Sequence, residues 1–458
     1  MENNIFSTKY HCKIPSSLDL DGLLQNKPIT VSQYKNDPYT IKDTLAYIIN
    51  CISSGMILKH QNSITHEFVP LSSVILHSVV RNHNEYLNYL MVNNIIVSDT
   101  KYKPGIKSIG YKFTFDVSSF NNYYIYDPKI IYKIRHSMKS NFKRQHPEYA
   151  HLLPHFQDLS YDHHQALSLI ATLNDPIKEQ RAWDGLNRIG ANNNFWSVDR
   201  SGRFYSCVTM LPKIVRPALR WKNQPLVEHD LKCAIPFFTL PLLNPLNWDN
   251  TLCEIVMKWN PNIILPSTSY IPINTYSYNI NKYYTILYKE PKFLHHFMCT
   301  EICPRDIELY SELVLPPDKD LYQYLSEYWN SHPAIKSKAR IDRDFAKKKL
   351  LMIFNSPSFH SNIYRSTLME LFPNVLAIFD WINTGYTRTN GMGHNKYDLH
   401  CPFAHIGFNL ESNFIIKNVT KNISIHNSEI PMFSIHDSIL CLERDSEIIT
   451  HYLNLQNN

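Results

Sequence analysis

MFSIHDSILCLE, residues 432–443, places the polar residues His436, Asp437 and Ser438 between two short apolar runs. Apolar runs of this length on both sides of a polar turn are typical of a buried β-hairpin. The sequence therefore predicts a hairpin that presents His436 and Asp437 at its turn, with Ser438 supporting that turn. The alternative is an ordinary β-turn pair without a further role.

A second acid follows another apolar run upstream. LVEHDLKCAIPFF, residues 226–238, predicts a strand that delivers Asp230 just before the chain turns through Pro236. The alternative is that Asp230 serves only as a turn residue or helix N-cap.

Basic residues lie between these two acids in the chain. RIDRDFAKKKLLMIFNS, residues 340–356, predicts a helix on which Arg343 and Lys347, four positions apart, share one face. The alternative is a solvated charged face. Another string, VDRSGRFYS, carries Asp199 and Arg203 upstream of the first acid.

These residue types suit the joining of a nucleotide to a 3′ hydroxyl. That reaction uses two metal ions roughly 3.5–4 Å apart, one at the attacking oxygen and one at the triphosphate and leaving group. Magnesium prefers a few carboxylates together with phosphate oxygens. We therefore predict Asp230 and Asp437 as ligands of two Mg²⁺ ions, with Mn²⁺ as an alternative metal. Arg343 and Lys347 are predicted to bind the triphosphate.

The order and spacing of these strings resemble the palm and fingers of the family A polymerases, especially the single-subunit phage and mitochondrial RNA polymerases. The resemblance covers about residues 190–450 and implies an α+β right-hand fold of palm, fingers and thumb-like helices. In that family the acid of the first palm motif falls on Asp230, and the second palm motif falls on His436, Asp437 and Ser438. The resemblance implies that His436 positions the primer end.

The resemblance extends to residues around the palm acids. The Arg and Lys of the fingers helix fall on Arg343 and Lys347. DRSGRFY is similar to the Asp-x-x-Gly-Arg string that those RNA polymerases carry before the first palm acid, so Asp199 and Arg203 are expected to hold template or product. FNLESNFI, with Glu411, falls where such enzymes have a helix that leads into the His-Asp hairpin.

Two positions depart from the family pattern. Eight residues after Lys347, where the family usually has Tyr, this chain has Asn355, which we assign to nucleotide binding. Five residues after Asp230, where DNA polymerases of the family place a Glu that excludes ribose, this chain has Ile235. The resemblance therefore favours ribonucleotides. A DNA polymerase and a template-independent nucleotide transferase of the same fold are the alternatives.

The first part of the chain has the pattern of a small separate module. Between about residues 40 and 97, apolar residues three or four apart predict helices, the last of which runs into a strand. Two β-rich runs then flank a Lys-bearing tip. This order resembles a winged helix-turn-helix domain, whose second helix enters the major groove and whose wing touches the DNA backbone; a protein-docking module is the alternative. The predicted phosphate contacts of the wing are Tyr102, Lys103, Lys107 and Lys112.

The charge distribution favours a polyanionic partner. Between residues 101 and 150, ten Lys and Arg residues stand against three acids, a local net charge of +7, whereas the whole chain carries +6. A second basic run extends from Lys336 to Lys349. Separate basic segments on a near-neutral chain suit a nucleic acid held at defined places, and a solvated surface is the alternative. We predict Arg135 and Lys139, in the first basic segment, as nucleic-acid contacts.

Together these patterns predict a chain of three parts. Residues 1–116 form the winged helix-turn-helix-like module, residues 117–190 a helical, basic, thumb-like connection, and residues 191–458 the palm and fingers. The expected function is a template-directed nucleotidyltransferase, leaning toward a DNA-directed RNA polymerase, with nucleic acid template and primer and nucleoside triphosphates as partners. The rival interpretation is a DNA-binding replication initiator or regulator with an inactive polymerase-like half.

Composition excludes other classes. Eleven glycines in 458 residues, with no GxGxxG or Walker string, argue against a glycine-loop nucleotide site. No apolar run reaches the roughly 18 residues of a membrane span. The nine cysteines form no paired CxxC repeat. We therefore expect no membrane partner and a cytoplasmic location.

Overall fold

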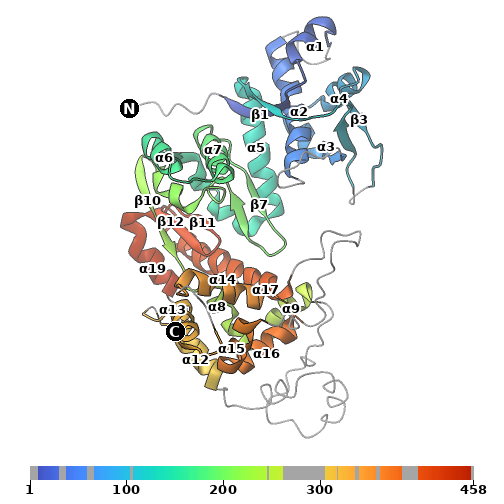
Figure 1. Cartoon of the computed structure of the whole chain (residues 1–458). Coiled ribbons are helices and arrows are strands. Elements are labelled where there is room, and N and C mark those ends of the chain that lie inside the picture. The colour runs from blue at the N-terminus through green and yellow to red at the C-terminus, as the bar shows by residue number, and fades with distance from the viewer. Residues whose placement is uncertain are drawn as a thin grey trace. The chain divides into compact units, whose positions relative to one another are not determined.

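A computed structural model describes residues 9–29, 38–58, 67–103, 107–244, 247–260, 305–316, 318–335, 340–356, 362–383 and 401–454. These residues form helices and short strands, as expected for an α+β fold (Figure 1). The first residues of the basic run that begins at Lys336, residues 336–339, lie outside the described part.

The chain divides into two compact units. The first contains residues 1–197 and 205–227, and the second contains residues 198–204 and 228–458. The predicted segments 1–116 and 117–190 both fall within the first unit, and most of 191–458 falls within the second. The predicted domain limits themselves stay predictions.

The elements of the first unit alternate between helices and short antiparallel strands. The tip of the β7–β8 hairpin and the end of β10 belong to the second unit. In chain order the elements are β1 (Tyr10–Pro15), α1 (Leu20–Asn26), α2 (Pro38–Leu58), β2 (Val69–Pro70), α3 (Ser73–Val79), α4 (His83–Val92), β3 (Ile96–Ser98), β4 (Gly110–Phe113), β5 (Phe120–Ile125), α5 (Pro128–Gln145), the 3₁₀ helices η1 (Pro147–Leu152) and η2 (Pro154–Asp158), β6 (Leu159–Tyr161), α6 (His163–Ile170), α7 (Pro176–Gly190), β7 (Trp196–Val198), β8 (Phe204–Ser206), the 3₁₀ helix η3 (Lys213–Ala218), β9 (Leu219–Trp221) and β10 (Gln224–Asp230).

The helices and the hairpin expected after residue 40 are present. Helix α3 begins where the Ser72 hydroxyl accepts a hydrogen bond from Ile75 N–H, and α4 follows it directly. Strands β3 and β4 then pair antiparallel, and β4 also pairs with β2, so the sheet order is β2-β4-β3. Leu76, Tyr86 and Leu90 of the two helices are buried in one core with the residues of this sheet.

The second unit is mostly helical around one small hairpin. In chain order its elements are α8 (Ala234–Thr239), the 3₁₀ helix η4 (Leu240–Leu243), α9 (Asn250–Trp259), α12 (Arg305–Val314), α13 (Leu321–Ser331), α14 (Arg343–Phe354), α15 (Ile363–Leu371), α16 (Pro373–Ile382), α17 (Pro402–Ser412), the π-helix η7 (Asn413–Thr420), α18 (Lys421–His426), β11 (Phe433–Ile435), β12 (Ser438–Leu442), the 3₁₀ helix η8 (Glu443–Asp445) and α19 (Ser446–Asn454).

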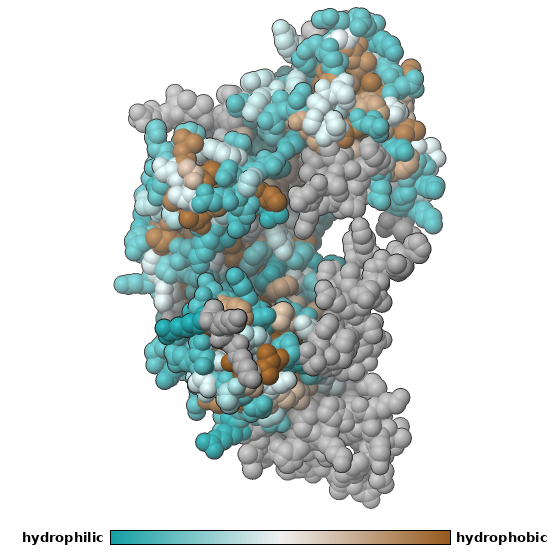
Figure 2. Space-filling view, in the orientation of Figure 1, coloured by the Kyte–Doolittle hydropathy of each residue, from teal (hydrophilic) through white to brown (hydrophobic). Residues whose placement is uncertain are grey.

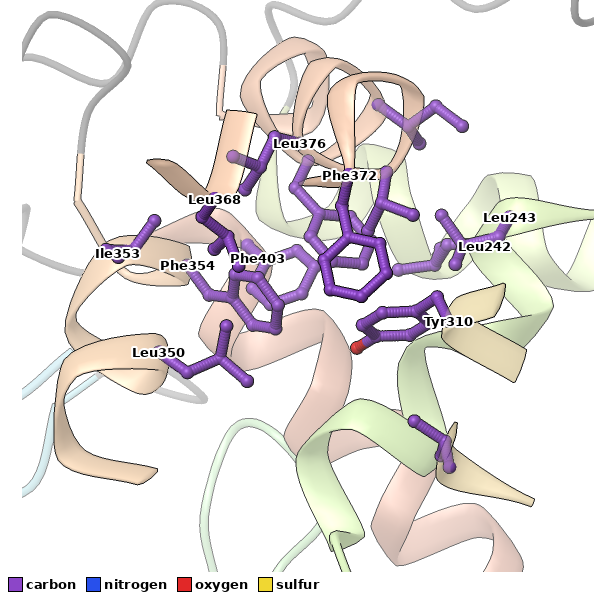
Figure 3. Close-up of a cluster of buried hydrophobic side chains, with 14 of the residues drawn as sticks. Leu242, Leu243, Tyr310, Leu350, Ile353, Phe354, Leu368, Phe372, Leu376 and Phe403 are labelled. Atoms are coloured by element: carbon purple, nitrogen blue, oxygen red, sulfur yellow. The ribbon is translucent and has the colours of Figure 1, made fainter. Parts of the chain in front are cut away.

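An aromatic core holds these helices in place. Figure 3 shows the Tyr310 ring of α12 facing the Phe372 ring, with centroids 5.5 Å apart and the planes nearly perpendicular. Phe354, from the end of α14, packs edge-on against Phe379 and Phe403. Perpendicular aromatic pairs of this kind are the favoured geometry of buried rings. The core therefore fixes α14, which carries the predicted basic face.

The surface shows little apolar clustering. In Figure 2 the visible face of the described residues is largely hydrophilic, and its hydrophobic residues form small separate groups. Among the described helices, none combines the length and the hydropathy that a membrane-spanning segment needs. The seven cysteines of the described ranges are all free thiols.

Candidate active site

The predicted hairpin is confirmed at residues 433–442. Strands β11 and β12 pair with Ile435 opposite Ser438, so His436 and Asp437 alone form the turn. His436 has a φ of 55°, in the left-handed region that residues with a side chain seldom adopt. Ser438 is buried, and its hydroxyl donates to the Glu228 carboxylate at 2.9 Å. The turn is therefore anchored to β10 by the residue predicted to support it.

The two predicted acids lie next to each other. Strand β10 neighbours β12 and ends at Asp230, and the following Leu231 N–H donates to the backbone oxygen of Asp437 at 3.1 Å. Asp230 is exposed, whereas Asp437 is partly buried. Two carboxylates from strings some two hundred residues apart thus meet at one end of the strand pair.

The charges around Asp437 act in opposite directions. Burial and the neighbouring Asp230 carboxylate raise the pKa of Asp437, while Arg203 and Lys347 lower it. An acid whose ionisation is hindered by burial and a neighbouring acid, with cations opposing that effect, is a common feature of functional sites. The hairpin turn, the end of β10 and the basic side chains thus share one electrostatic environment.

Helix α14 presents the basic face that the sequence predicts. The Arg343 guanidinium lies 5.3 Å and the Lys347 ammonium 5.7 Å from the centroid of one ring, that of Tyr322, so the two residues share a face. Lys349 points elsewhere, because its ammonium lies 5.2 Å from the rings of Phe345 and Tyr364. Of these lysines, Lys347 is therefore the one on the Arg343 face.

Asp320 holds Arg343 in place, and sequence reasoning missed it. Its carboxylate caps α13 by accepting from Tyr322 N–H at 2.9 Å, and it accepts from Arg343 Nε at 2.8 Å. Burial raises the pKa of Asp320, but the hydrogen bonds from Arg343 and Gln323 N–H, together with the Arg343 and Lys232 charges, outweigh burial and lower it. An Asp directly before a helical pattern is a readable N-cap signal, yet the partner 23 residues away is not readable.

A tight turn at residues 199–203 positions the side chain of Arg203. The Asp199 carboxylate accepts from Ser201 N–H at 2.8 Å and from Arg203 N–H at 3.0 Å. Gly202 has a φ of 86°, a conformation that favours glycine and explains the glycine in this string. One Asp199 oxygen thus holds the turn. The contact of Asp199 with nucleic acid stays a prediction.

Arg203 forms a buried ion pair with Glu411 of α17. Its Nε and Nη2 donate to the two carboxylate oxygens at 2.8 Å each, and the guanidinium lies 3.5 Å from the centroid of the Phe408 ring. The Glu411 side chain is only 1% exposed. Burial raises the pKa of Glu411 to about 7, against the Arg203 charge that lowers it, and Asp437 and Asp199 add to the rise.

Glu411 had no role assigned from the sequence. The pair joins α17 to the β7–β8 turn near Asp437, and no local pattern could have revealed it. The guanidinium is mostly covered, with 16% of the side chain exposed. Arg203 as a direct contact for template or product stays a prediction.

The remaining predicted contacts lie outside this cluster. Asn355 is exposed and caps the end of α14. On the β3–β4 tip, Lys107 pairs with Asp99 at 2.6 Å, Lys103 and Lys107 form a backbone bridge, and the Lys112 ammonium lies 4.9 Å from the Phe68 ring centroid. Their contacts with nucleotide or DNA stay predictions.

Arg135 and Lys139 are partly buried on α5. Arg135 Nη2 donates to the Ala191 carbonyl at 2.7 Å, and burial lowers the pKa of its guanidinium. Burial, with the nearby Lys143 charge, likewise lowers the pKa of Lys139. Arg135 thus has a clear structural partner within its own unit, and its predicted nucleic-acid contact is untested.

The residues present fit a magnesium site of the substrate-assisted kind. Among the described residues, no group of three or more His, Cys, Asp or Glu side chains could hold a metal ion. Magnesium, however, is commonly held by one or two carboxylates and completed by substrate phosphates and water. Asp230 and Asp437 supply that donor set.

The chain matches no known protein-family model and has no significant match among curated proteins.

Proposed function

We propose that this chain is a template-directed nucleotidyltransferase that extends a 3′ hydroxyl with nucleoside triphosphates. The proposal rests on one observation: Asp230 and Asp437 are adjacent through the Leu231–Asp437 hydrogen bond, and the Lys347 charge acts on Asp437. Acids beside a helix with a basic face suit a triphosphate whose charge grows on the leaving group. We assign the hairpin and β10 to a palm and α14 to a fingers helix.

Each residue of the cluster has a task in this proposal. Asp230 and Asp437 would hold the metal ions, which when bound activate the 3′ oxygen and neutralise charge on the leaving pyrophosphate. Lys347 and Arg343 donate to the phosphate oxygens. His436, fixed at the turn, orients the strand end.

The preference for ribose is part of the proposal. Ile235 lies five residues after Asp230, where DNA polymerases of the similar family place a ribose-excluding Glu. It packs against the apolar core of the second unit. An apolar side chain there would discriminate only weakly against an added 2′ hydroxyl. We therefore favour RNA synthesis over DNA synthesis.

Primer extension tests the proposal. The full chain is incubated with a labelled primer, with or without template, and with NTPs or dNTPs in the presence of Mg²⁺ or Mn²⁺. Template-dependent extension that is faster with NTPs is the expected result. Extension that ignores the template would replace the proposal by a terminal transferase. No extension with any substrate or metal would remove the proposed activity.

Asp320 offers a sharper test of the nucleotide-binding face. In an Asp320→Asn variant the N-cap is kept, because Asn caps as well as Asp, but the charged partner of Arg343 is lost. A hydrogen bond to a charged group contributes roughly 1.5–3 kcal/mol, so the KM for nucleotide is expected to rise about tenfold or more with little change in kcat. A Glu312→Gln variant, which alters an exposed acid on α12, is the control. An unchanged KM would show that Asp320 does not position Arg343.

A second candidate is DNA binding by the first unit alone. The order α3, α4, β3 and β4, with sheet order β2-β4-β3, agrees with that expected of a winged helix. This observation favours duplex contact by α4 and the β3–β4 tip. A chain that binds duplex DNA but extends no primer would be the replication initiator or regulator of the rival interpretation.

A further inference from the structure

A surface groove in the first unit is unrelated to the proposed transfer site. It measures about 1030 Å³ and lies where β5 leads into α5, beside the start of α2. Its lining contains several tyrosines and lysines. The lining residues used below are Tyr39, Lys42, Asp43, Tyr126, Asp127, Lys129 and Lys133.

Two acids hydrogen-bond the segments that line the groove: Asp43, which is buried, and Asp127, which is partly buried. The Asp43 carboxylate accepts from the Tyr123 hydroxyl at 2.8 Å and from the N–H groups of Tyr126 and Asp127 at 2.9 Å. The Asp127 carboxylate caps α5 and accepts from the Thr40 hydroxyl at 2.8 Å. Both carboxylates are thus engaged within the protein. Their oxygens are occupied by these hydrogen bonds, which order the backbone around the groove.

The tyrosines around this groove are unusually exposed. Tyr39 is 80% and Tyr126 62% exposed, and Tyr132, one turn along α5, is 69% exposed. Of the four tyrosines classed as exposed in the described residues, Tyr39 and Tyr126 line the groove, and Tyr132 lies next in sequence to the lining residue Lys133. The Tyr132 ring also stacks on His136, with centroids 5.8 Å apart. Flat rings with open faces are what nucleic-acid bases stack on.

Lysines accompany these rings. Lys129 and Lys133 lie one turn apart on α5, and neither has an ion-pair partner among the described residues. Lys42 is different, because it pairs with Asp21 at 2.7 Å. Uncompensated ammonium groups beside stacking faces are complementary to a phosphate backbone with unpaired bases.

We propose that this groove binds single-stranded nucleic acid. Bases stack on Tyr39, Tyr126 and Tyr132, and the backbone phosphates contact Lys129 and Lys133. Duplex DNA is a poorer occupant, because its bases are stacked on one another and expose no faces to the rings. The proposal stands independently of nucleotide transfer and of the β3–β4 tip.

Fluorescence anisotropy with labelled oligo(dT) and oligo(rU) strands about 20 nucleotides long tests the proposal. For the double variant Tyr126→Ala/Tyr132→Ala of the full chain, affinity for at least one of these strands is expected to fall by on the order of 10- to 100-fold. Comparing the two strands shows whether DNA or RNA is the preferred ligand. For Lys129→Gln/Lys133→Gln, the slope of log affinity against log salt is expected to shrink by about 1.4.

Matched variants separate this groove from other surfaces. Lys178→Gln removes an exposed lysine of α7 and is expected to leave single-strand affinity unchanged. Asp437→Asn is also expected to bind strands normally, which separates this inference from the proposed activity. Unchanged melting temperatures verify that the groove variants fold.

Three results would overturn the proposal. The tyrosine variant could bind single strands like the wild type. It could lose duplex affinity to the same extent, which would assign the surface to duplex DNA. Alternatively, only binding to phosphatidylserine vesicles could fall, which would assign the groove to a lipid surface.

Discussion

The Asp437→Asn variant is expected to lose nucleotide transfer by on the order of 10³-fold or more. Asparagine has the same shape, and its backbone oxygen can still accept from Leu231 N–H. It carries no charge, however, and so it is a poor ligand for a divalent ion. The measurement is single-turnover primer extension under conditions in which the wild type is active.

The same variant is expected to be at least as stable as the wild type. Burial and Asp230 raise the pKa of Asp437, so ionising this carboxylate costs free energy in the folded state at neutral pH. Asparagine removes that cost. Loss of activity without loss of stability is the signature of a residue kept for function rather than for folding.

Glu429→Gln is the matched control for Asp437→Asn. Glu429 is an exposed acid in the segment that leads into the hairpin, and its removal is expected to change neither rate nor melting temperature. If Asp437→Asn kept more than about a tenth of the wild-type rate, the two-carboxylate mechanism would not hold.

The Arg203→Ala variant is expected to lose roughly 3–5 kcal/mol of stability in the second unit at about pH 8. Removal of the Arg203 guanidinium leaves the Glu411 side chain, which is 1% exposed, buried without its cationic partner. The substitution also removes the contact of the guanidinium with the Phe408 ring. Breaking one side of a buried pair is more costly than replacing both sides. Because the chain has two compact units, we expect a single global unfolding transition to be a poor measure of the stability of the second unit. Denaturant-dependent hydrogen exchange of the α17 amides reports the relevant local stability.

The loss is expected to depend on pH. The pKa of Glu411 is raised from 4.5 to about 7 in the folded wild type, and removal of Arg203 raises it further. A raised pKa means that the folded state binds the proton more tightly than the unfolded state, so stability falls as pH rises through this range. In Arg203→Ala, Glu411 is neutral at about pH 5.5, and the destabilisation is expected to be clearly smaller there than at about pH 8.

Two further variants complete this experiment. Arg203→Ala/Glu411→Gln carries no buried charge and is expected to recover roughly half of the lost stability at about pH 8. Arg203→Lys keeps the charge but loses the two-pronged hydrogen bond, so an intermediate loss is expected. A destabilisation by Arg203→Ala that was the same at both pH values would contradict the assignment of Glu411 as the titrating group.

Several elements of the site could be predicted because their signals are local. The two apolar runs around Asp437 pair with each other as neighbours in the chain, and the structure has the hairpin at the predicted position. The four-residue spacing of Arg343 and Lys347 reflects helix periodicity, and both side chains lie over Tyr322. Gly202, in the string that is similar to Asp-x-x-Gly-Arg, has the positive φ that explains a glycine there.

Long-range partners could not be predicted in this way. Arg203 and Glu411 are 208 residues apart, and Asp320 and Arg343 are 23 residues apart on different helices. Neither pair can be recognised from a periodic pattern in the sequence, because each residue also belongs to a local pattern that explains its presence without the distant partner. The groove beside α5 is a similar case, since its tyrosines come from separate elements.

The sequence by itself determined the local features: two acids after apolar strands, a basic helix face and a glycine-dependent turn. These features depend on hydrogen bonding and side-chain periodicity between residues that are close in the chain, so the order of residues is enough to predict them. Only the tertiary structure decided which of them meet. It set Asp230 beside Asp437, distinguished Lys347 from Lys349, and buried Glu411 against Arg203, because burial and charge pairing depend on how distant segments pack together.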